Sequence, residues 1–199
     1  MAYPSPPWRL DARMWLSVFV VRDTGRADRH AGVYGAALVG YRETGVLAYH
    51  ELFVARLHDV RRRQLRITDI WVDSPTSLEG GRSLWAIPKE LADLPLRSTS
   101  AGPLTRTSFS AVAAGHQVAH GAFTSTPRAA LVRAPFAMTT SQVRADRTVV
   151  ETPFGGSARA VPCRAAWRFD ADGPLGFLAG RRPVVSLLVD DARVTFGRG

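Results

Sequence analysis

The chain has 199 residues, of which 46% are hydrophobic and 22% are charged, as is usual for a folded globular protein with one sizeable core. No apolar run comes near the roughly 20 residues that a membrane-spanning helix needs, and the first residues lack the basic and apolar regions of a secretory signal. We therefore expect no membrane span and a cytoplasmic location.

The charge of the chain is strongly positive, with a formal net charge of +9. The basic residues are spread along the sequence, however, and the one tight cluster is Arg61–Arg63 with Arg66 nearby. No aromatic residues alternate with that cluster, as they do in proteins that stack single-stranded bases. Charge alone is therefore a weak reason to expect a nucleic-acid partner.

Several short runs rich in Val, Phe, Trp and Ile predict strands, and Asp23–Gly32 is polar enough to be a loop. Glu43-Thr44-Gly45 is a plausible hairpin turn between two of these strands. The expected strands are Met14–Val21, Val33–Gly40, Val46–Leu57, Leu65–Asp73, two within Thr105–Phe123 that turn near Ala113–His116, Ala129–Val132, Val161–Phe169 and Pro183–Val189.

The best helix candidate lies in Ser83–Leu94, which contains Pro88. Because proline is tolerated only in the first turn of a helix, the sequence predicts a helix that begins near Pro88. Lys89 and Glu90 would then lie at its N-terminus, after a loop that begins at Gly80-Gly81-Arg82.

Many short strands and few helices predict a mostly antiparallel barrel or sandwich. The sequence shows neither an internal repeat nor a linker, so we expect residues 1–199 to form a single domain.

Lysine is nearly absent from this chain: 25 of its 26 basic residues are arginine, and Lys89 is the exception. Arginine can replace lysine wherever only a positive charge is needed. Lysine, unlike arginine, can lose its proton when buried and act as a nucleophile or a base. Lys89 is therefore the leading candidate for a chemical role, although a chance survivor is the alternative.

Familiar cofactor and metal motifs are missing. The sequence has no glycine-rich nucleotide loop, no nucleophile elbow and no pair of closely spaced cysteines. Cys163 is alone, and His116 and His120 lack the glutamate of a zinc-protease helix. We therefore expect a protein that needs neither a cofactor nor a metal.

The segment Gly81–Leu91, GRSLWAIPKEL, resembles the signature of the acetoacetate decarboxylases, in which a Pro-Lys-Lys contains the lysine that forms a Schiff base. Weaker similarity extends over Pro7–Arg13, Gly40–Glu43 and Val72–Pro75, and over Gly173–Leu175 and Pro183–Val185. The resemblance implies a mostly β, cone-like antiparallel barrel with a few short helices, an interior small-molecule site and a homo-oligomer.

The resemblance also implies roles for particular residues. Lys89 takes the place of the Schiff-base lysine, Arg13 that of the active-site arginine, and Glu43 that of an acidic residue of the site. Arg82, Trp85 and Glu90 belong to the signature and would lie near the substrate pocket.

Two positions depart from the family signature. Glu90 stands where the family has a second lysine, and Ser83 stands where it has glutamate. A carboxylate beside Lys89 would keep the amine protonated, which opposes imine formation. Asp28 is the one candidate for a further carboxylate of the site.

Three hypotheses for function follow. The first is an enzyme that forms an imine between Lys89 and a keto acid or related carbonyl compound, leading to decarboxylation or to aldol or dehydration chemistry. The second is a cyclase or isomerase of specialised, polyketide-like metabolism, in which Lys89 is a charged hydrogen-bond donor. The third is a non-catalytic module that binds a small ligand or nucleic acid.

Overall fold

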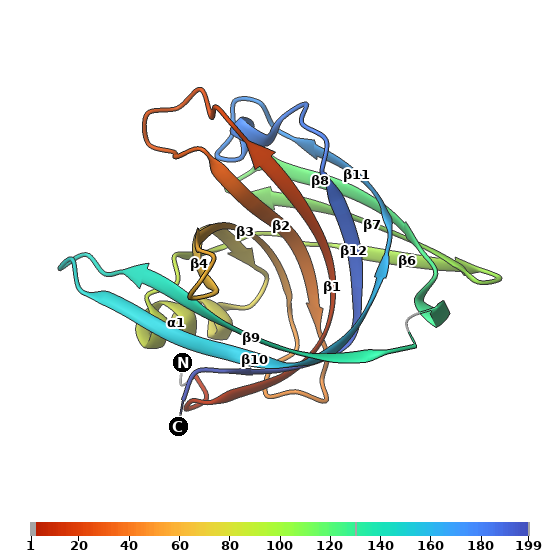
Figure 1. The fold of residues 1–199 in the computed structure, drawn as a ribbon, viewed down its shortest axis with the longest axis horizontal. Coiled ribbons are helices and arrows are strands. Elements are labelled where there is room, and N and C mark those ends of the chain that lie inside the picture. Colours follow the sequence, from red (N-terminus) through yellow and green to blue (C-terminus); the bar gives the residue numbers. More distant parts are fainter. Residues whose placement is uncertain (1–2, 130, 199) are drawn as a thin grey trace.

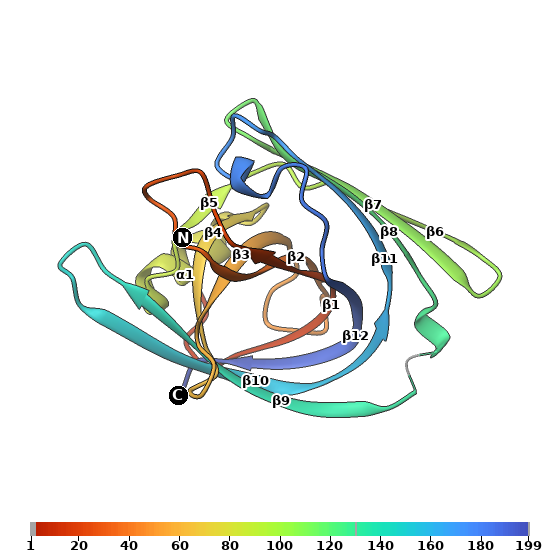
Figure 2. The same ribbon diagram turned by 45° about the horizontal axis from the view of Figure 1, so that its top comes forward.

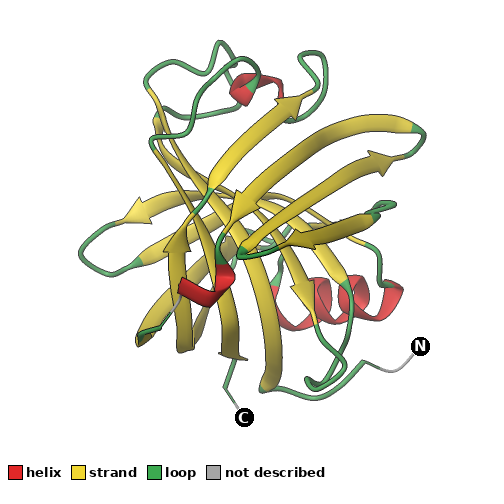
Figure 3. Ribbon diagram, turned by 90° about the vertical axis from the view of Figure 1, so that its right-hand side faces the viewer, coloured by secondary structure: helices red, strands yellow, loops and turns green. Residues whose placement is uncertain are grey.

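A computed structural model of the chain describes residues 3–129 and 131–198. Strands dominate the described part, with a single α-helix there and two short 3₁₀ segments (Figures 1 and 3). The strands are β1 Trp8–Val21, β2 Gly32–Tyr41, β3 His50–Asp59, β4 Gln64–Val72, β5 Lys89–Leu91, β6 Leu96–Ala101, β7 Leu104–Ala113, β8 His116–Ser125, β9 Arg133–Val143, β10 Val149–Pro162, β11 Arg164–Phe169 and β12 Val185–Phe196, and the helix is α1 Pro75–Trp85.

The larger sheet closes on itself. Its strand order is β3-β2-β1-β12-β10-β9-β4-β5, and an additional pairing of β3 with β4 makes a closed barrel of seven strands with β5 on its edge (Figure 2). Most pairs are antiparallel, whereas β4 runs parallel to β5 and to β9. The mostly β, barrel-like fold predicted from the sequence is confirmed.

A bulge in β12, at Asp190–Asp191, helps the sheet to curl. The register shifts between Ala12 and Met14 where β1 pairs with β12, and between Ser157 and Arg159 where β10 pairs with β12. A bulge bends its strand and increases the local twist. The bulge in β12 therefore bends this part of the sheet, next to β1 and β10.

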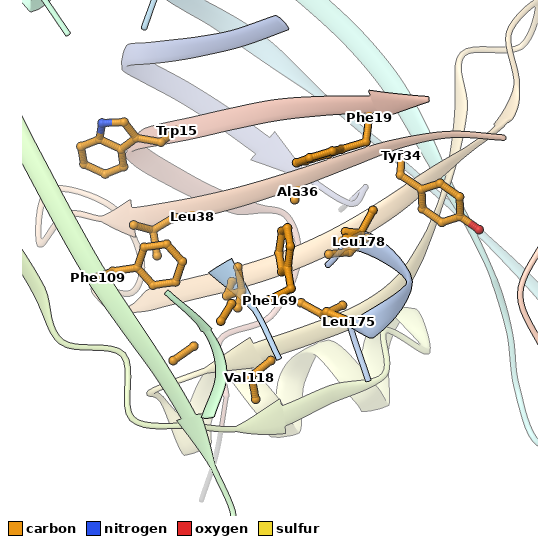
Figure 4. Close-up of a cluster of buried hydrophobic side chains, with 14 of the residues drawn as sticks. Trp15, Phe19, Tyr34, Ala36, Leu38, Phe109, Val118, Phe169, Leu175 and Leu178 are labelled. Carbon is orange, nitrogen blue, oxygen red and sulfur yellow. The ribbon is translucent and has the colours of Figure 1, made fainter. Parts of the chain in front are cut away.

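The outer face of the barrel packs against the smaller sheet, whose strand order is β11-β8-β7-β6. In β1, Trp15 and Phe19 point outward into this contact, as the period of two in a strand requires. They meet aromatic side chains of the second sheet, such as Phe109 and Phe169, in the largest apolar cluster of the protein (Figure 4). This core is what holds the two sheets together.

In the same strands, the residues that alternate with these outward-pointing side chains form the inner face of the barrel. Ala12 of β1 and Val39 of β2 pack there with the small side chains of Ala158 and Ala192. At one end, α1 supplies Trp85, which packs with buried barrel residues in a separate cluster. The helix therefore covers one end of the barrel.

The helix does not begin at Pro88, so that prediction is wrong. It begins thirteen residues earlier in the chain, at Pro75, because Ser74 caps it by accepting a hydrogen bond from the Ser77 amide. It ends at Trp85, and the C-cap residue Ala86 adopts the left-handed conformation with φ 54°. Gly80, Gly81 and Arg82 are therefore helical, and Lys89 lies in a strand.

Two further strand predictions are wrong, and two long strands were missed. The run Ala129–Val132 is not a strand: its first residue ends a 3₁₀ segment, β9 starts only at Arg133, and Ala130 lies outside the described residues. The long strands β9 and β10 were missed because their alternation is broken by glycine, proline and polar residues. The strand predicted from Val46 begins at His50, since residues 42–49 form a longer connection.

Candidate active site

Lys89 lies on the inner face of the barrel. It opens β5 and is in register with Ile70 of β4, which in turn is in register with Phe53 of β3. Paired residues in adjacent strands share a face, so Lys89 points inward. The side chain passes over α1 at Gly81, where an added Cβ would come within 2.8 Å of the Lys89 Cδ and Cε atoms. Glycine at this helical position therefore leaves room for the lysine.

The Lys89 amine is enclosed by three oxygen atoms. Its Nζ donates to Glu51 Oε2 at 2.9 Å, to Ser77 Oγ at 2.8 Å and to the Tyr49 hydroxyl at 3.4 Å. Lys89 is only 3% exposed and Glu51 only 5%. An ammonium group has three protons to donate, so these oxygens satisfy it fully.

Two tyrosines complete the site around Glu51. The Tyr41 hydroxyl donates to Glu51 Oε1 at 3.2 Å, and the Tyr49 hydroxyl donates to Oε2 at 3.4 Å. The two rings stack with their centroids 4.4 Å apart. Glu51 therefore holds the lysine and both hydroxyl groups in one connected network, which we call the Lys89 network: Tyr41, Tyr49, Glu51, Ser77 and Lys89.

Electrostatics in the Lys89 network favour the charged pair. Burial lowers the pKa of the Lys89 amine, but the negative charge of Glu51 and the hydrogen bonds from Lys89 to Glu51 and Tyr49 outweigh it, so the pKa lies above its ordinary value. Burial, followed by the charge of Glu51, raises the pKa of Tyr49 to about 12. The same two causes raise the pKa of Tyr41 well above its ordinary value. At neutral pH the site holds an ammonium group and two neutral phenols.

These shifts predict that the protein loses stability in alkali. The folded state keeps the Lys89 proton above the ordinary pKa of 10.5, and keeps the Tyr49 proton between pH 10 and about 12. The unfolded chain releases both protons earlier, so the free energy of unfolding should fall as the pH rises above about 10. Urea denaturation at a series of pH values from 8 to 11.5 measures this fall. Tyr49→Phe should reduce its slope, and a flat profile would contradict the assignment.

Arg13 does not reach the Lys89 network. It is in register with Gly40 of β2, and Gly40 is in register with His50 of β3, so these residues share one face of the sheet. Glu51 follows His50 in β3, and its side chain therefore lies on the opposite face from Arg13. Its guanidinium group donates to both oxygens of Asp190, at 2.8 and 3.2 Å. The structure thus places Arg13 in an outward ion pair.

The two other carboxylates singled out from the sequence also lie elsewhere. Glu43 is exposed in the connection between β2 and β3. Asp28 is exposed in the connection between β1 and β2, where Arg26 donates to it at 3.2 Å and lowers its pKa. The structure brings neither carboxylate to Lys89.

The signature residues Arg82, Trp85 and Glu90 lie near Lys89 but are not part of the Lys89 network. Glu90 is exposed and, as the next residue of the strand, points to the opposite face, where it lines a surface cleft of about 490 Å³. The Arg82 Nε donates to the Lys89 backbone carbonyl at 2.7 Å. Trp85 is buried and packs edge-to-face against Trp8 and Phe196. The carboxylate that acts on the lysine is thus Glu51, and Glu90 faces away.

Sequence reasoning missed Glu51, Tyr41, Tyr49 and Ser77. One signal was present: Glu51 is a charged residue that directly precedes an apolar strand segment, Leu52–Ala55. A buried carboxylate needs a partner of opposite charge, but this signal does not tell which cation lies beside it. Ser77 carries no comparable signal, because its role depends on where α1 begins.

Cys163 and the arginine cluster do not belong to the Lys89 network. Burial raises the pKa of the Cys163 thiol to about 11, so it carries no thiolate at neutral pH. Arg61–Arg63 lie exposed in the turn between β3 and β4. Within residues 3–129 and 131–198, no group of three His, Cys, Asp or Glu side chains is placed to hold a metal ion.

Several solved structures of enzymes share this architecture. The enduracididine biosynthesis enzyme MppR is 16% identical, with a TM-score of 0.66, and the match covers 98% of this chain and 87% of that one. Acetoacetate decarboxylase from Legionella pneumophila is 12% identical, with a TM-score of 0.63 and coverage of 98% and 85%. An acetoacetate decarboxylase-like enzyme from Sphingomonas wittichii is 13% identical, with a TM-score of 0.57 and coverage of 96% and 90%.

No protein-family model matches the sequence, and no curated protein matches it. The barrel described above is of the kind found in these enzymes. The chain has the acetoacetate-decarboxylase-like fold, over nearly its whole length. In the described part of the chain, no helix combines the length and the hydropathy needed to cross a membrane.

Proposed function

We propose that the protein is an enzyme that forms an imine between Lys89 and a small carbonyl compound. The observation that carries this proposal is the contact between the Lys89 amine and Glu51 inside the barrel, at 2.9 Å. The fold supports it, because the similar structures are those of enzymes, and one of them, MppR, has been solved in complex with pyruvate.

Glu51 provides the base that a protonated lysine needs before it can form an imine. The pKa of Lys89 is raised, so the resting amine is protonated and cannot attack a carbonyl. The carboxylate that raises the pKa is also within hydrogen-bond distance, and it is the group to which the amine can pass its proton. A ligand that enters the barrel and separates Nζ from part of its hydrogen-bond network would favour this transfer.

Imine formation at Lys89 needs two proton transfers, and both pass through Glu51. Lys89 gives one proton to Glu51, and the free amine attacks the carbonyl carbon to form a carbinolamine. Glu51 returns the proton to the carbinolamine hydroxyl, which leaves as water, and the C–N bond becomes a protonated imine. The positive imine then accepts the electrons of a neighbouring bond as it breaks. Tyr41 and Tyr49, which hold Glu51, are placed to orient it in both proton transfers.

Oxygen exchange tests this step. A ketone labelled with ¹⁸O loses its label to water each time an imine forms and is hydrolysed. Wild-type protein should speed the loss of label from 2-octanone or pyruvate, as followed by mass spectrometry, and Lys89→Arg should not. Arg13→Met, which breaks only the outward ion pair, should exchange like the wild type.

A second candidate function is favoured by the raised pKa of Lys89. In a cyclase or isomerase that forms no covalent intermediate, the ammonium group would donate a hydrogen bond to a substrate carbonyl and stabilise an enolate. Such an enzyme would bind the ketone without exchanging its oxygen. Binding without exchange would therefore replace the first proposal with the second.

A further inference from the structure

The inner face of the barrel next to Glu51 is apolar over several strands. In the first row away from Glu51, Val39, Met14 and Val189 are in register across β2, β1 and β12. In the next row the residues are Ala37, Leu16 and Leu187. We call these six residues the inner wall. It is continuous with the Lys89 network because Val39 is the register partner of Glu51.

Charges are nearly absent from this face. Of the side chains that face inward by register in the described strands of the barrel and β5, only Lys89 and Glu51 are charged. Arginines of the same strands point outward: Arg13 bonds Asp190, Arg66 bonds the Ser141 carbonyl, and Arg133 bonds Asp191. In a chain with 26 basic residues, this leaves a face with one cation, which Glu51 already neutralises.

The inward-facing apolar surface becomes more exposed with distance from Lys89. Ala37 and Val39 are 0% and 3% exposed. Farther along the same strands, at the end away from α1, Val20, Val33 and Val185 are 50%, 36% and 43% exposed. Their register places them on the same face, with Val20 opposite Val33. The apolar inward-facing residues therefore run from exposed valines at one end of the strands to the row beside Glu51.

Such a surface discriminates between ligands by charge. A carboxylate moved from water onto an apolar wall loses its hydration and must find a cation in return. Here the one inward cation is held by Glu51, so a carboxylate would have to displace it and leave a second buried anion unpaired. Hydrocarbon, by contrast, gains about 25 cal/mol for each Å² removed from water.

We propose that the natural ligand is a neutral, carbon-rich carbonyl compound without a carboxylate, with its carbonyl at Lys89 and its hydrocarbon part on the inner wall. This inference rests on the proposed function for the position of the carbonyl. It also narrows the chemistry, because a ligand without a carboxylate cannot lose carbon dioxide. The bond that breaks next to the imine is then a C–H, C–C or C–O bond, as in aldol and dehydration reactions.

Binding of two matched series of ligands tests the substrate class. The neutral series is 2-butanone, 2-hexanone, 2-octanone and 2-decanone. Each member of the acidic series has the same chain and the same carbonyl group, with a carboxylate at the end of the chain that is farther from the carbonyl. Each is titrated into the wild-type protein by isothermal calorimetry. Affinity for the neutral series should rise up to about fourfold for each added CH₂ group, from about 0.8 kcal/mol per buried CH₂. Each acid should bind at least about tenfold more weakly than its neutral partner.

A charge placed on the inner wall should reverse this preference. Leu16→Arg puts a cation on the wall, so it should strengthen binding of the acids relative to the ketones. Thr195→Arg adds the same charge at an exposed position of β12 and should leave the preference unchanged. If Leu16→Arg does not fold, the wild-type comparison of the two series still decides.

Acids that bind as tightly as the ketones, or ketones whose affinity does not rise with length, would overturn the inference. Reduction of the bound complexes with borohydride separates it from the proposed function. Acids that bind tightly and form an adduct on Lys89 would retain the imine enzyme and reject the neutral ligand. Ketones that bind with the expected length dependence and form no adduct would retain the ligand class and reject the imine.

Discussion

Lys89→Met should lower the free energy of unfolding by about 3–5 kcal/mol, because it leaves the Glu51 carboxylate buried without its cation. Methionine fills nearly the same space, so loss of packing contributes little to this difference. Glu51 would keep only its hydrogen bonds from Tyr41 and Tyr49, at 3.2 and 3.4 Å. Urea denaturation of both proteins at pH 7 measures the change.

The double variant Lys89→Met with Glu51→Gln should recover most of this loss, since it removes both charges together. Arg13→Met is the matched control: it breaks an ion pair whose arginine side chain is 31% exposed, and should cost no more than about 1 kcal/mol. A Lys89→Met variant as stable as this control would show that the buried pair does not hold the site together.

Gly156→Ala should also be strongly destabilising, by more than about 3 kcal/mol. Gly156 lies in β10 beside the bulge, and a Cβ there would come within 1.8 Å of the Arg193 carbonyl oxygen. The obstacle is backbone of the paired strand β12, so relief requires the two strands to separate. Thermal unfolding followed by circular dichroism would report this as a lower melting temperature.

Gly35→Ala provides the comparison, because it adds the same methyl group to another barrel strand. Its Cβ would meet only the end of the flexible Leu16 side chain, at 3.2 Å. We expect a change of about 1 kcal/mol or less, in either direction. Equal effects of the two substitutions would mean that β10 and β12 do not approach each other this closely at the bulge.

The class of fold was predictable because the strands that build the outer core follow simple rules. The runs around Trp15, Leu38 and Val54 are apolar on one face at least, and each proved to be a strand. β9 and β10 have no such pattern. Their inner faces mix apolar and polar residues, and these faces point into the interior of the barrel instead of packing in the core between the two sheets. Their pairing is set by the closure of the sheet, which no local pattern reveals.

The site was predictable in part. Lys89 stood out by composition, and the structure encloses it among polar side chains inside the barrel. Glu51 lies 38 residues away in the chain and meets Lys89 only through the pairing of β3, β4 and β5. Glu90 attracted attention as the neighbour in sequence, but neighbours in a strand face opposite sides. The proper partner therefore could not be named before the register was known.

Three sequence-based expectations stay predictions: the single domain, the cytoplasmic location and the homo-oligomer. The proposed catalytic roles of Arg13 and Glu43 find no support in the contacts of these residues. The carboxylate in contact with the Lys89 amine is that of Glu51.

Reductive trapping of an imine on Lys89 tests the central claim most directly. The protein is incubated with a ketone and borohydride, and its intact mass is then compared with that of Lys89→Arg treated in the same way. Because Lys89 is the only lysine, peptide mapping need separate it only from the N-terminal amine. We expect one stable adduct per chain, on Lys89, and none on the variant. A protein that binds the ketone by calorimetry but gains no mass on Lys89 would contradict the account.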